Sequence, residues 1–468
     1  MHRYDAGSDV LTQAVVRYAI DRVRTKPPPL DHPRTPEQLR AMAGRTITDR
    51  GIGGLEALRV FADVLAPACI SVDHPRYLSF VPAAPTEASI LFDLVVGATS
   101  VFAGSWLEGA GAVFAENEAL RWISDLAGLP AGAGGVFVSG GTTGNLSALL
   151  AARWKWRMDA GGAKDRTRGL MVVSGGAHSS IAQAARAMDA DLVVVPADDR
   201  GRLTAAATER SVAALTDEDR GRLFAVVATS GTTNAGVVDD LVAAADAARE
   251  LDTWLHVDGA YGGAGLAAPS IRHLFDGIDR ADSFIVDPHK WLFAPFDSCA
   301  LVYRDPEIGR LAHTQHAEYL DVLHADHEDH VNIGGSANWN PSDFAHHLTR
   351  RARGLPFWFS LATYGTAAYS TAIEKTLQTT RQGAELVRAA EHLELVMEPE
   401  LSIVLFRRTG WQPADYQAWS EDQLRRGESF VTPSAWGDET VVRWCIVNPE
   451  TTVDDLAAIV ASLETFTR

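Results

Sequence analysis

The spacing of hydrophobic residues in the first 75 positions is helical. It predicts helices over 8–23, 35–42 and 51–65. Thr35 followed by Pro36 is typical of a helix start, and Pro67 ends the third helix. A proline-rich segment, 26–30, separates the first two helices. Three helices with such a break make a poor core of their own, so we expect residues 1–75 to form an arm that packs on another subunit.

From about residue 76, short and nearly continuous apolar runs alternate with helical ones. The predicted strands are 135–139, 170–174, 192–196, 223–229, 254–258, 284–287 and 299–304. Such strands indicate a parallel or mixed sheet that is covered on both faces.

The pattern changes again beyond residue 351. A long helix over 357–379 is followed by strands at 403–406 and 441–447, and a last helix begins at Val453. The sequence therefore predicts an α/β fold, with a large domain over 76–350 and a small α+β domain over 351–468.

Composition narrows the possible functions. The 468 residues are 46% hydrophobic and 22% charged, and the formal net charge of -18 argues against nucleic acid or an anionic membrane as the main partner. Cys69, Cys299 and Cys445 are far apart and indicate neither a disulfide framework nor a zinc site. We find no signal core and no apolar stretch long enough to cross a bilayer, so we expect a cytoplasmic protein.

Candidate chemistry lies in two segments about one βαβ unit apart, His-Val-Asp-Gly-Ala-Tyr over 256–261 and Asp-Pro-His-Lys-Trp over 287–291. Each follows a predicted strand, so Asp258 and Lys290 can converge on one crevice. Pyridoxal phosphate (PLP) needs such a pair: the lysine forms a Schiff base with its aldehyde, and the carboxylate keeps its ring nitrogen protonated. Burial and a neighbouring positive charge are expected to lower the pKa of Lys290 and free its amine.

Three further polar segments follow strands. The glycine- and threonine-rich turn 139–145 opens a helix over 146–156 and can bind an anion, although a simple tight turn stays an alternative. His178 can stack on a flat cofactor or serve a structural role, and 229–234 is either a site segment or a solvated turn.

The stretch 313–347 is rich in histidine, aspartate and glycine. The spacing of His324, His327 and His330 suggests a metal site, but no predicted helix or strand fixes these side chains, so we expect no metal. A mobile loop that closes over an active site is the favoured interpretation.

Together these segments resemble the PLP-dependent group II amino-acid decarboxylases, which include the aromatic-L-amino-acid, glutamate and tyrosine/tryptophan decarboxylases. The Ser-Gly-Gly-Thr turn, Ala-His-Ser-Ser, His-Val-Asp-Gly-Ala-Tyr and Asp-Pro-His-Lys-Trp occur in the family's order. The resemblance extends from His74 to the C-terminal strands. It implies PLP fold-type I with a seven-stranded sheet in the large domain, a domain-swapped N-terminal arm, and a homodimer with active sites at its interface.

The resemblance also implies residue roles. Lys290 would be the Schiff-base lysine, Asp258 the partner of the ring nitrogen, and His178 a ring-stacking residue that contacts the substrate carboxylate. Tyr319 would protonate the substrate carbon after CO2 leaves, as in amine-forming members. Further cofactor contacts are implied for Gly141, Thr142, Thr233, Ala260, Asp287 and His289.

For the substrate pocket, the resemblance points to Phe80, Pro82, Phe102, Gly104 and Thr349. Phe80 and Pro82 keep a wall suited to an aromatic ring, whereas Gly104 stands where relatives carry an aromatic residue. Thr349 falls where a hydroxyl in plant relatives accompanies phenolic substrates. We therefore expect an aromatic L-amino acid to be converted into its amine and CO2.

Four alternatives stay open at this point. Arg76 can pair with an acidic side chain, as a glutamate-type enzyme would require. An oxygen-using aldehyde synthase, or a fold-type I transaminase or lyase, can be built on the same scaffold. A binding protein that kept only the fold is the last, and the joint presence of Lys290, Asp258 and His178 argues against it.

Overall fold

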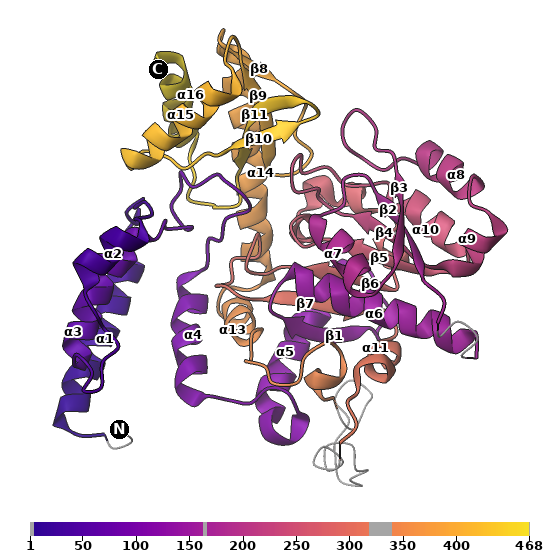
Figure 1. Ribbon diagram of the computed structural model, residues 1–468, viewed down its shortest axis with the longest axis horizontal. Helices are drawn as coiled ribbons and strands as arrows, with labels where there is room; N and C mark the ends of the chain where they lie inside the picture. Colours follow the sequence, from indigo (N-terminus) through magenta and orange to yellow (C-terminus); the bar gives the residue numbers. More distant parts are fainter. Residues whose placement is uncertain (1–3, 162–165, 318–338, 468) are drawn as a thin grey trace.

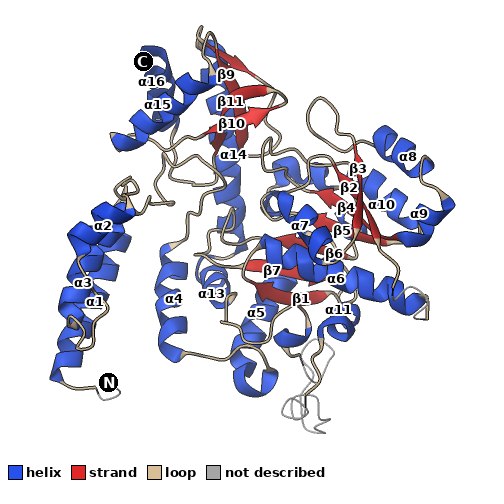
Figure 2. Ribbon diagram, viewed as in Figure 1, coloured by secondary structure: helices blue, strands red, loops and turns tan. Residues whose placement is uncertain are grey.

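A seven-stranded sheet forms the centre of the molecule in the computed structural model, which describes residues 4–161, 166–317 and 339–467 (Figures 1 and 2). In sheet order the strands are β1 (Gly134–Val138), β7 (Cys299–Tyr303), β6 (Ser283–Val286), β5 (Trp254–Asp258), β4 (Leu223–Thr229), β2 (Leu170–Ser174) and β3 (Asp191–Val195). Only β7 runs antiparallel to its neighbours. The predicted α/β fold with a mostly parallel seven-stranded sheet is confirmed.

Helices cover both faces of this sheet (Figure 2). They are α5 (Trp106–Leu126), α6 (Gly141–Asp159), α7 (Ser179–Ala187), α8 (Ala205–Ala213), α9 (Asp217–Arg222), α10 (Leu241–Glu250) and α11 (Pro306–His313). Successive residues of a strand enter opposite hydrophobic cores: Phe137 packs in one, Val136 and Val138 in the other. Burial on both faces explains why the strands appear in the sequence as continuous apolar runs.

The C-terminal part contains a second sheet, antiparallel and four-stranded, in the order β10 (Pro433–Trp436), β11 (Glu439–Cys445), β9 (Ile403–Arg408) and β8 (Leu393–Leu395). Helices α15 (Pro413–Arg425) and α16 (Val453–Thr465) accompany it. The single helix expected over 357–379 is wrong. It is divided into α13 (Leu355–Tyr364) and α14 (Thr366–Ala389) at Gly365, whose φ of +77° favours glycine and ends a helix.

The N-terminal helices stand apart from the sheet (Figure 1). They are α1 (Ala6–Arg24), α2 (Pro36–Ala43), α3 (Gly54–Val60) and the π-helical turn Phe61–Leu65, followed after a loop by α4 (Glu87–Thr99). Thr35 caps α2 through a reciprocal bond with Gln38, as its place before Pro36 predicts. No residue of α1 or α2 is buried in this chain.

Short 3-10 segments complete the fold: Ala66–Ala68, Gly262–Ala267, Pro269–Phe275, Ile278–Arg280 and Pro341–Asp343. Among the described residues, no helix combines the length and the apolar character that crossing a bilayer requires.

A buried ion pair joins α5 to the segment that leads into α13. Arg350 donates to both carboxylate oxygens of Glu116, at 2.7 and 2.8 Å. Glu116 also accepts from the Gly354 N–H, and Arg350 donates to the Ala103 carbonyl. The side chains of Glu116 and Arg350 are only 2% and 1% exposed. Each charge is therefore neutralised by the other and not by water.

Replacing one partner of this pair should therefore destabilise the protein strongly. We expect Glu116→Ala to lower the free energy of unfolding by about 3–5 kcal/mol, because the Arg350 guanidinium is left buried and unpaired. Thermal or denaturant unfolding measures the change. Asp159→Ala, which removes an exposed partner of Lys155, serves as control and should leave the unfolding midpoint nearly unchanged. Equal midpoints for the two variants would contradict the prediction.

Candidate active site

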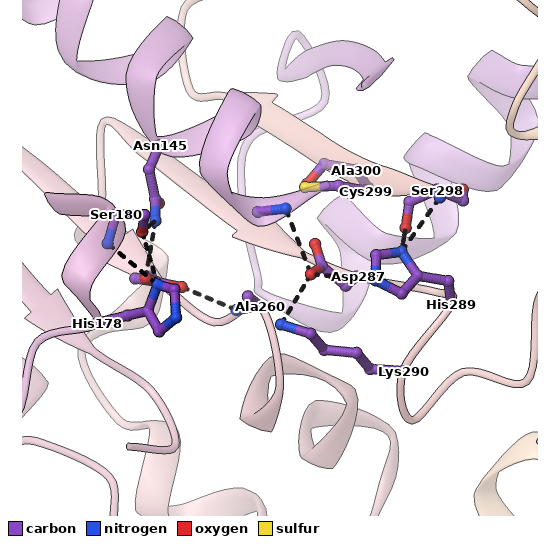
Figure 3. Close-up of polar contacts among 12 residues, drawn as sticks. Asn145, His178, Ser180, Ala260, Asp287, His289, Lys290, Ser298, Cys299 and Ala300 are labelled. Atoms are coloured by element: carbon purple, nitrogen blue, oxygen red, sulfur yellow. Dashed lines mark hydrogen bonds and ion pairs between the residues drawn. The ribbon is translucent and has the colours of Figure 1, made fainter. Parts of the chain in front are cut away.

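One cavity lies at the edge of the large sheet where the parallel strands end. Nine of the predicted site residues line it: Gly141, Thr142, His178, Thr233, Asp258, Ala260, Asp287, His289 and Lys290. Their segments follow β1, β2, β4, β5 and β6, so the topology brings together residues from 141 to 290 (Figure 3). The cavity has a volume of about 270 Å³.

Lys290 is held at the cavity by a carboxylate. Its Nζ lies 2.9 Å from Asp287 Oδ2, and its side chain is 24% exposed. Burial acts to lower the pKa of Lys290, but the charge and hydrogen bond of Asp287, helped by Asp258, outweigh it and raise this pKa above its ordinary value. The expectation of a lowered pKa is therefore wrong, because the groups beside the amine are anions.

Asp287 is almost fully enclosed, at 1% exposure. Burial acts to raise the pKa of its carboxyl, but the charge of Lys290 outweighs this and holds the pKa below its ordinary value. Beside it, His289 Nδ1 donates to the Ser298 carbonyl oxygen at 2.6 Å, and the ring centre of His289 lies 5.0 Å from that of Phe296. Burial lowers the pKa of His289, so the ring is neutral at pH 7.

Asp258 sits at the end of β5 and is 4% exposed. Its two oxygens accept from different donors: Oδ2 from Asn145 Nδ2 at 2.8 Å, and Oδ1 from the Ala260 N–H at 3.1 Å. Behind Asn145 lies His256, whose Nε2 is 2.9 Å from Asn145 Oδ1. Complete burial lowers the pKa of His256 to about 4.

His178 caps the N-terminus of α7 and is exposed in this chain. Its Nδ1 accepts from the Ser180 N–H at 3.2 Å and lies 2.9 Å from the Ser180 hydroxyl. These bonds orient the ring along the cavity wall (Figure 3).

Four residues that shape this region were not predicted from the sequence: Asn145, Ser180, His256 and Arg443. Two of them have a positional signal. Asn145 lies one helical turn after Gly141 and so faces the same side of α6, and His256 lies two residues before Asp258 on the same face of β5.

Arg443, on β11, links the C-terminal sheet to the cavity edge. It is 5% exposed and donates to the carbonyls of Thr233, Asn234 and Phe80. Phe80 has a φ of +54° and a side chain that is 61% exposed, so this backbone clamp presents an aromatic ring to solvent.

None of the five predicted substrate residues, Phe80 included, lines this cavity. Pro82, Phe102, Gly104 and Thr349 are absent from its wall, and the Phe102 ring instead packs over Gly104, where an added Cβ would lie 2.5 Å from Phe102 Cζ. Thr349 is exposed.

Some predicted residues lie outside the described part of the chain, and Arg76 makes a contact other than the one predicted. Tyr319, His324, His327 and His330 lie outside the described residues. Arg76 donates to Asp455 at 2.8 Å and does not line the cavity, which argues against a role in binding an acidic side chain. In the ranges that the structure describes, no group of three or more His, Cys, Asp or Glu side chains is arranged to hold a metal.

The sequence model of the pyridoxal-dependent decarboxylase conserved domain matches residues 36–409. The chain belongs to this family. The decarboxylase is 30% identical over 404 residues to the aromatic-L-amino-acid decarboxylase of Bacillus atrophaeus, covering 84% of this chain and 81% of the relative. It is 34% identical over 342 residues to the L-2,4-diaminobutyrate decarboxylase of Rhizobium meliloti (strain 1021), covering 72% and 65%.

Its fold is similar to the crystal structure of Oryza sativa TDC with PLP and tryptamine, with a TM-score of 0.88, 23% identity and coverage of 99% and 98%. The resemblance to group II decarboxylases and fold-type I is thus confirmed, and with them the activity: the chain is a PLP-dependent amino-acid decarboxylase.

The cavity fits this cofactor in three respects. The N-terminus of α6 has no side-chain cap at Gly140, and although the Gly141 N–H lies 3.3 Å from Asp287 Oδ2, the Thr142 N–H that follows can serve a phosphate. A Cβ at Gly141 would lie 3.0 Å from Ala260 and 3.2 Å from Asp287 Oδ2, so glycine keeps this turn open. Thr229 Oγ1, in the cavity wall, is buried without a hydrogen-bond partner among the described residues.

Buried histidines should make the stability of the decarboxylase sensitive to acid. Burial lowers the pKa of His256, His313 and His347 to about 4, from 6.5. Below pH 6.5 these three histidines bind protons in the unfolded chain but not in the folded chain. The stability that they contribute is therefore complete above pH 6.5 and is lost as the pH falls towards 4. We expect His256→Gln to reduce this slope by about one proton, roughly 1.4 kcal/mol per pH unit.

Unfolding midpoints of the PLP-saturated protein between pH 7 and pH 4.5 measure this slope. His32→Gln, a change at an exposed histidine, is the control and should keep the wild-type slope. An unchanged slope in His256→Gln would show that the buried ring takes up its proton in the folded state.

Proposed function

We propose that this enzyme decarboxylates an aromatic L-amino acid to its amine, with Lys290, Asp258 and His178 at the centre of the reaction. The observation that carries the proposal is that an amine and a doubly hydrogen-bonded carboxylate line one cavity beside an uncapped helix N-terminus. This is the set of groups that a PLP aldehyde, ring nitrogen and phosphate require.

Each part of the cofactor then has a partner. Lys290 would bind it through the side-chain amine, and Asp258 would hold a proton on the ring nitrogen. Gly141 and Thr142 would receive the phosphate at the N-terminus of α6, beside Thr233, Asp287 and His289. His178 and Ala260 would flank the ring. Bound PLP supplies an electron-withdrawing ring that accepts the electrons of the bond to the departing carboxylate.

The chain's own groups orient the substrate and control its protons. Ordered by Ser180, His178 would contact the substrate carboxylate and orient the substrate in the cavity. Asp258, with two donors fixed on its oxygens, would keep its orientation while the ring nitrogen stays protonated. For the protonation that completes amine formation we propose Tyr319, on the basis of the family resemblance alone.

An aromatic substrate is favoured by exposed rings near the cavity. Phe296 lines the cavity and is 52% exposed, and Phe80, 61% exposed, is tied by Arg443 to Thr233 in the cavity wall. Exposed phenyl rings gain free energy when an apolar group covers them. Aromatic-L-amino-acid decarboxylases also stand among the relatives. L-2,4-diaminobutyrate, named for other relatives, is the substrate class to test against them.

An amino-acid panel with CO2 and amine readouts tests this proposal. We expect release of CO2 and amine in equal amounts from phenylalanine, tyrosine, tryptophan or a hydroxylated analogue. With diaminobutyrate or glutamate we expect at most about one hundredth of that kcat/KM, because their charged side chains bury less apolar area against phenyl rings than an aromatic ring does. Lys290→Ala should lose the visible absorption of bound PLP and at least about 1000-fold in kcat.

Hydrogen peroxide and aldehyde in place of amine would favour the aldehyde synthase. A preference for diaminobutyrate would overturn the aromatic assignment. Unchanged turnover in Lys290→Ala would overturn the assignment of the site.

We further propose that the enzyme is a homodimer and that residues 1–75 form an arm that packs on the partner, with 76–350 and 351–468 as the large and small domains. Leu91, Leu94 and Val95 on α4 are 44%, 48% and 45% exposed in the single chain, and α1 and α2 bury none of their residues. Gathered apolar side chains of this kind are typical of a surface that another chain covers. A partner would also account for Phe102, Gly104 and Thr349, if they complete the neighbouring cavity.

A charge on α4 should weaken this dimer. We expect Leu94→Glu to shift the protein from dimer to monomer in light scattering coupled to size-exclusion chromatography, because burial of an unpaired carboxylate is unfavourable. Leu311→Glu, on α11, changes a leucine of the same 48% exposure and should remain dimeric. A monomeric wild-type protein, or a Leu94→Glu dimer as stable as the control, would contradict the proposal.

A further inference from the structure

A chain of buried hydrogen bonds runs behind the cavity. Trp254 Nε1 donates to Ser283 Oγ at 2.8 Å, Ser283 Oγ lies 2.9 Å from His256 Nδ1, and His256 Nε2 lies 2.9 Å from Asn145 Oδ1. Each of these four side chains is at most 5% exposed. None except Asn145 lines the cavity.

The chain divides at Asn145. Its amide nitrogen lies 2.8 Å from Asp258 Oδ2 and 2.9 Å from Ser180 Oγ, and the Ser180 hydroxyl lies 2.9 Å from His178 Nδ1 (Figure 3). One amide group thus contacts, directly or through one hydroxyl, two of the three residues placed at the centre of the reaction.

The direction of these bonds is fixed from both ends. An indole N–H can only donate, so Ser283 accepts from Trp254 and has its own hydrogen left for His256 Nδ1. An ionised carboxylate can only accept, so the Asn145 atom that faces Asp258 is the NH2. Asn145 Oδ1 therefore accepts from His256 Nε2–H, which is the neutral tautomer required at the other end. The lowered pKa of this buried ring, about 4, agrees with a neutral His256.

The direction of the hydrogen bonds also determines which nitrogen of His178 carries the proton. Both hydrogens of the Asn145 amide are used, one by Asp258 and one by Ser180. The Ser180 hydroxyl hydrogen is then free to donate to His178 Nδ1, and the Ser180 backbone N–H donates to the same atom. His178 Nδ1 thus carries no proton, and Nε2 carries the proton of the neutral ring.

We propose that Asn145, oriented by His256, is a positioning residue that fixes the Asp258 carboxylate and, through the Ser180 hydroxyl, reinforces the tautomer of His178 that the Ser180 N–H also selects. The proposal rests on the roles given above to Asp258 and His178. It assigns to the buried chain from Trp254 to Ser180 a function in catalysis although only Asn145 and Ser180 reach the cavity wall.

The two branches can be separated by mutation. Asn145→Leu removes both branches, and we expect PLP to bind about 10- to 100-fold more weakly, with kcat lowered as well, because Asp258 loses a charge-assisted hydrogen bond. Ser180→Ala removes only the branch to His178, so PLP affinity should stay within about twofold while kcat falls about 10-fold. PLP affinity is measured without substrate, by titration of the cofactor's visible absorption.

A conservative pair tests the role of His256. Gln retains an amide N–H that can donate to Asn145 Oδ1, whereas Leu does not. We expect His256→Gln to keep a PLP affinity near that of the wild type and His256→Leu to match Asn145→Leu.

Ser462→Ala is the matched control for Ser180→Ala. It removes a serine hydroxyl that accepts from Trp419 at 3.1 Å in the small domain, and should leave both PLP affinity and kcat unchanged. If a leucine variant does not fold, Ser180→Ala against Ser462→Ala still decides.

The proposal is overturned if Ser180→Ala keeps the wild-type kcat, or if His256→Leu binds PLP as the wild type does. Retained turnover in Lys290→Ala, by contrast, would overturn the proposed function and not this network.

Discussion

The structure of the site depends on one constraint: a carboxylate that is buried at a strand end must be hydrogen-bonded on both oxygens. Asp258 meets it with the Ala260 N–H on one side and Asn145 on the other. Asn145 supplies the second donor from a position one helical turn after the start of α6 at Gly141. That start also places the uncapped N-terminus of the helix beside Lys290. The helix that bonds the buried acid is thus the same one whose N-terminus is proposed to bind the phosphate.

Lys290 and Asp287 carry opposite charges at the same sheet edge, and each shifts the pKa of the other. The carboxylate is almost fully enclosed, yet its pKa stays low because the ammonium lies 2.9 Å away. The carboxylate in turn raises the pKa of the lysine against the effect of burial. The pair illustrates why a lysine at an active site cannot be assigned a low pKa from burial alone: the sign is set by the nearest charges.

Sequence reasoning located the large sheet well, because parallel strands buried on both faces leave continuous apolar runs that few other elements produce. It located nine cavity residues for a related reason, since the ends of such strands meet at one edge. It failed for β8 and β10, which have three and four residues and are partly exposed, and for the helix break at Gly365. Sequence reasoning did not identify Asn145 and His256, because their proposed role depends on the direction of hydrogen bonds, which the spacing of residues does not determine. Phe102 and Gly104 lie away from the cavity of their own chain, so periodicity could not place them in a pocket.

Arg443 joins the edge of the large sheet to the loop that carries Phe80. The residues proposed to hold the cofactor come from the edge of the sheet, whereas the loop that carries Phe80 is joined to this edge by Arg443, whose guanidinium binds the carbonyls of Phe80 and Thr233. A hydrogen bond to a backbone carbonyl does not depend on the side chain of the residue that provides it. At Phe80 the backbone clamp therefore sets no requirement on the side chain, so the ring that faces solvent is separable from the groups at the sheet edge.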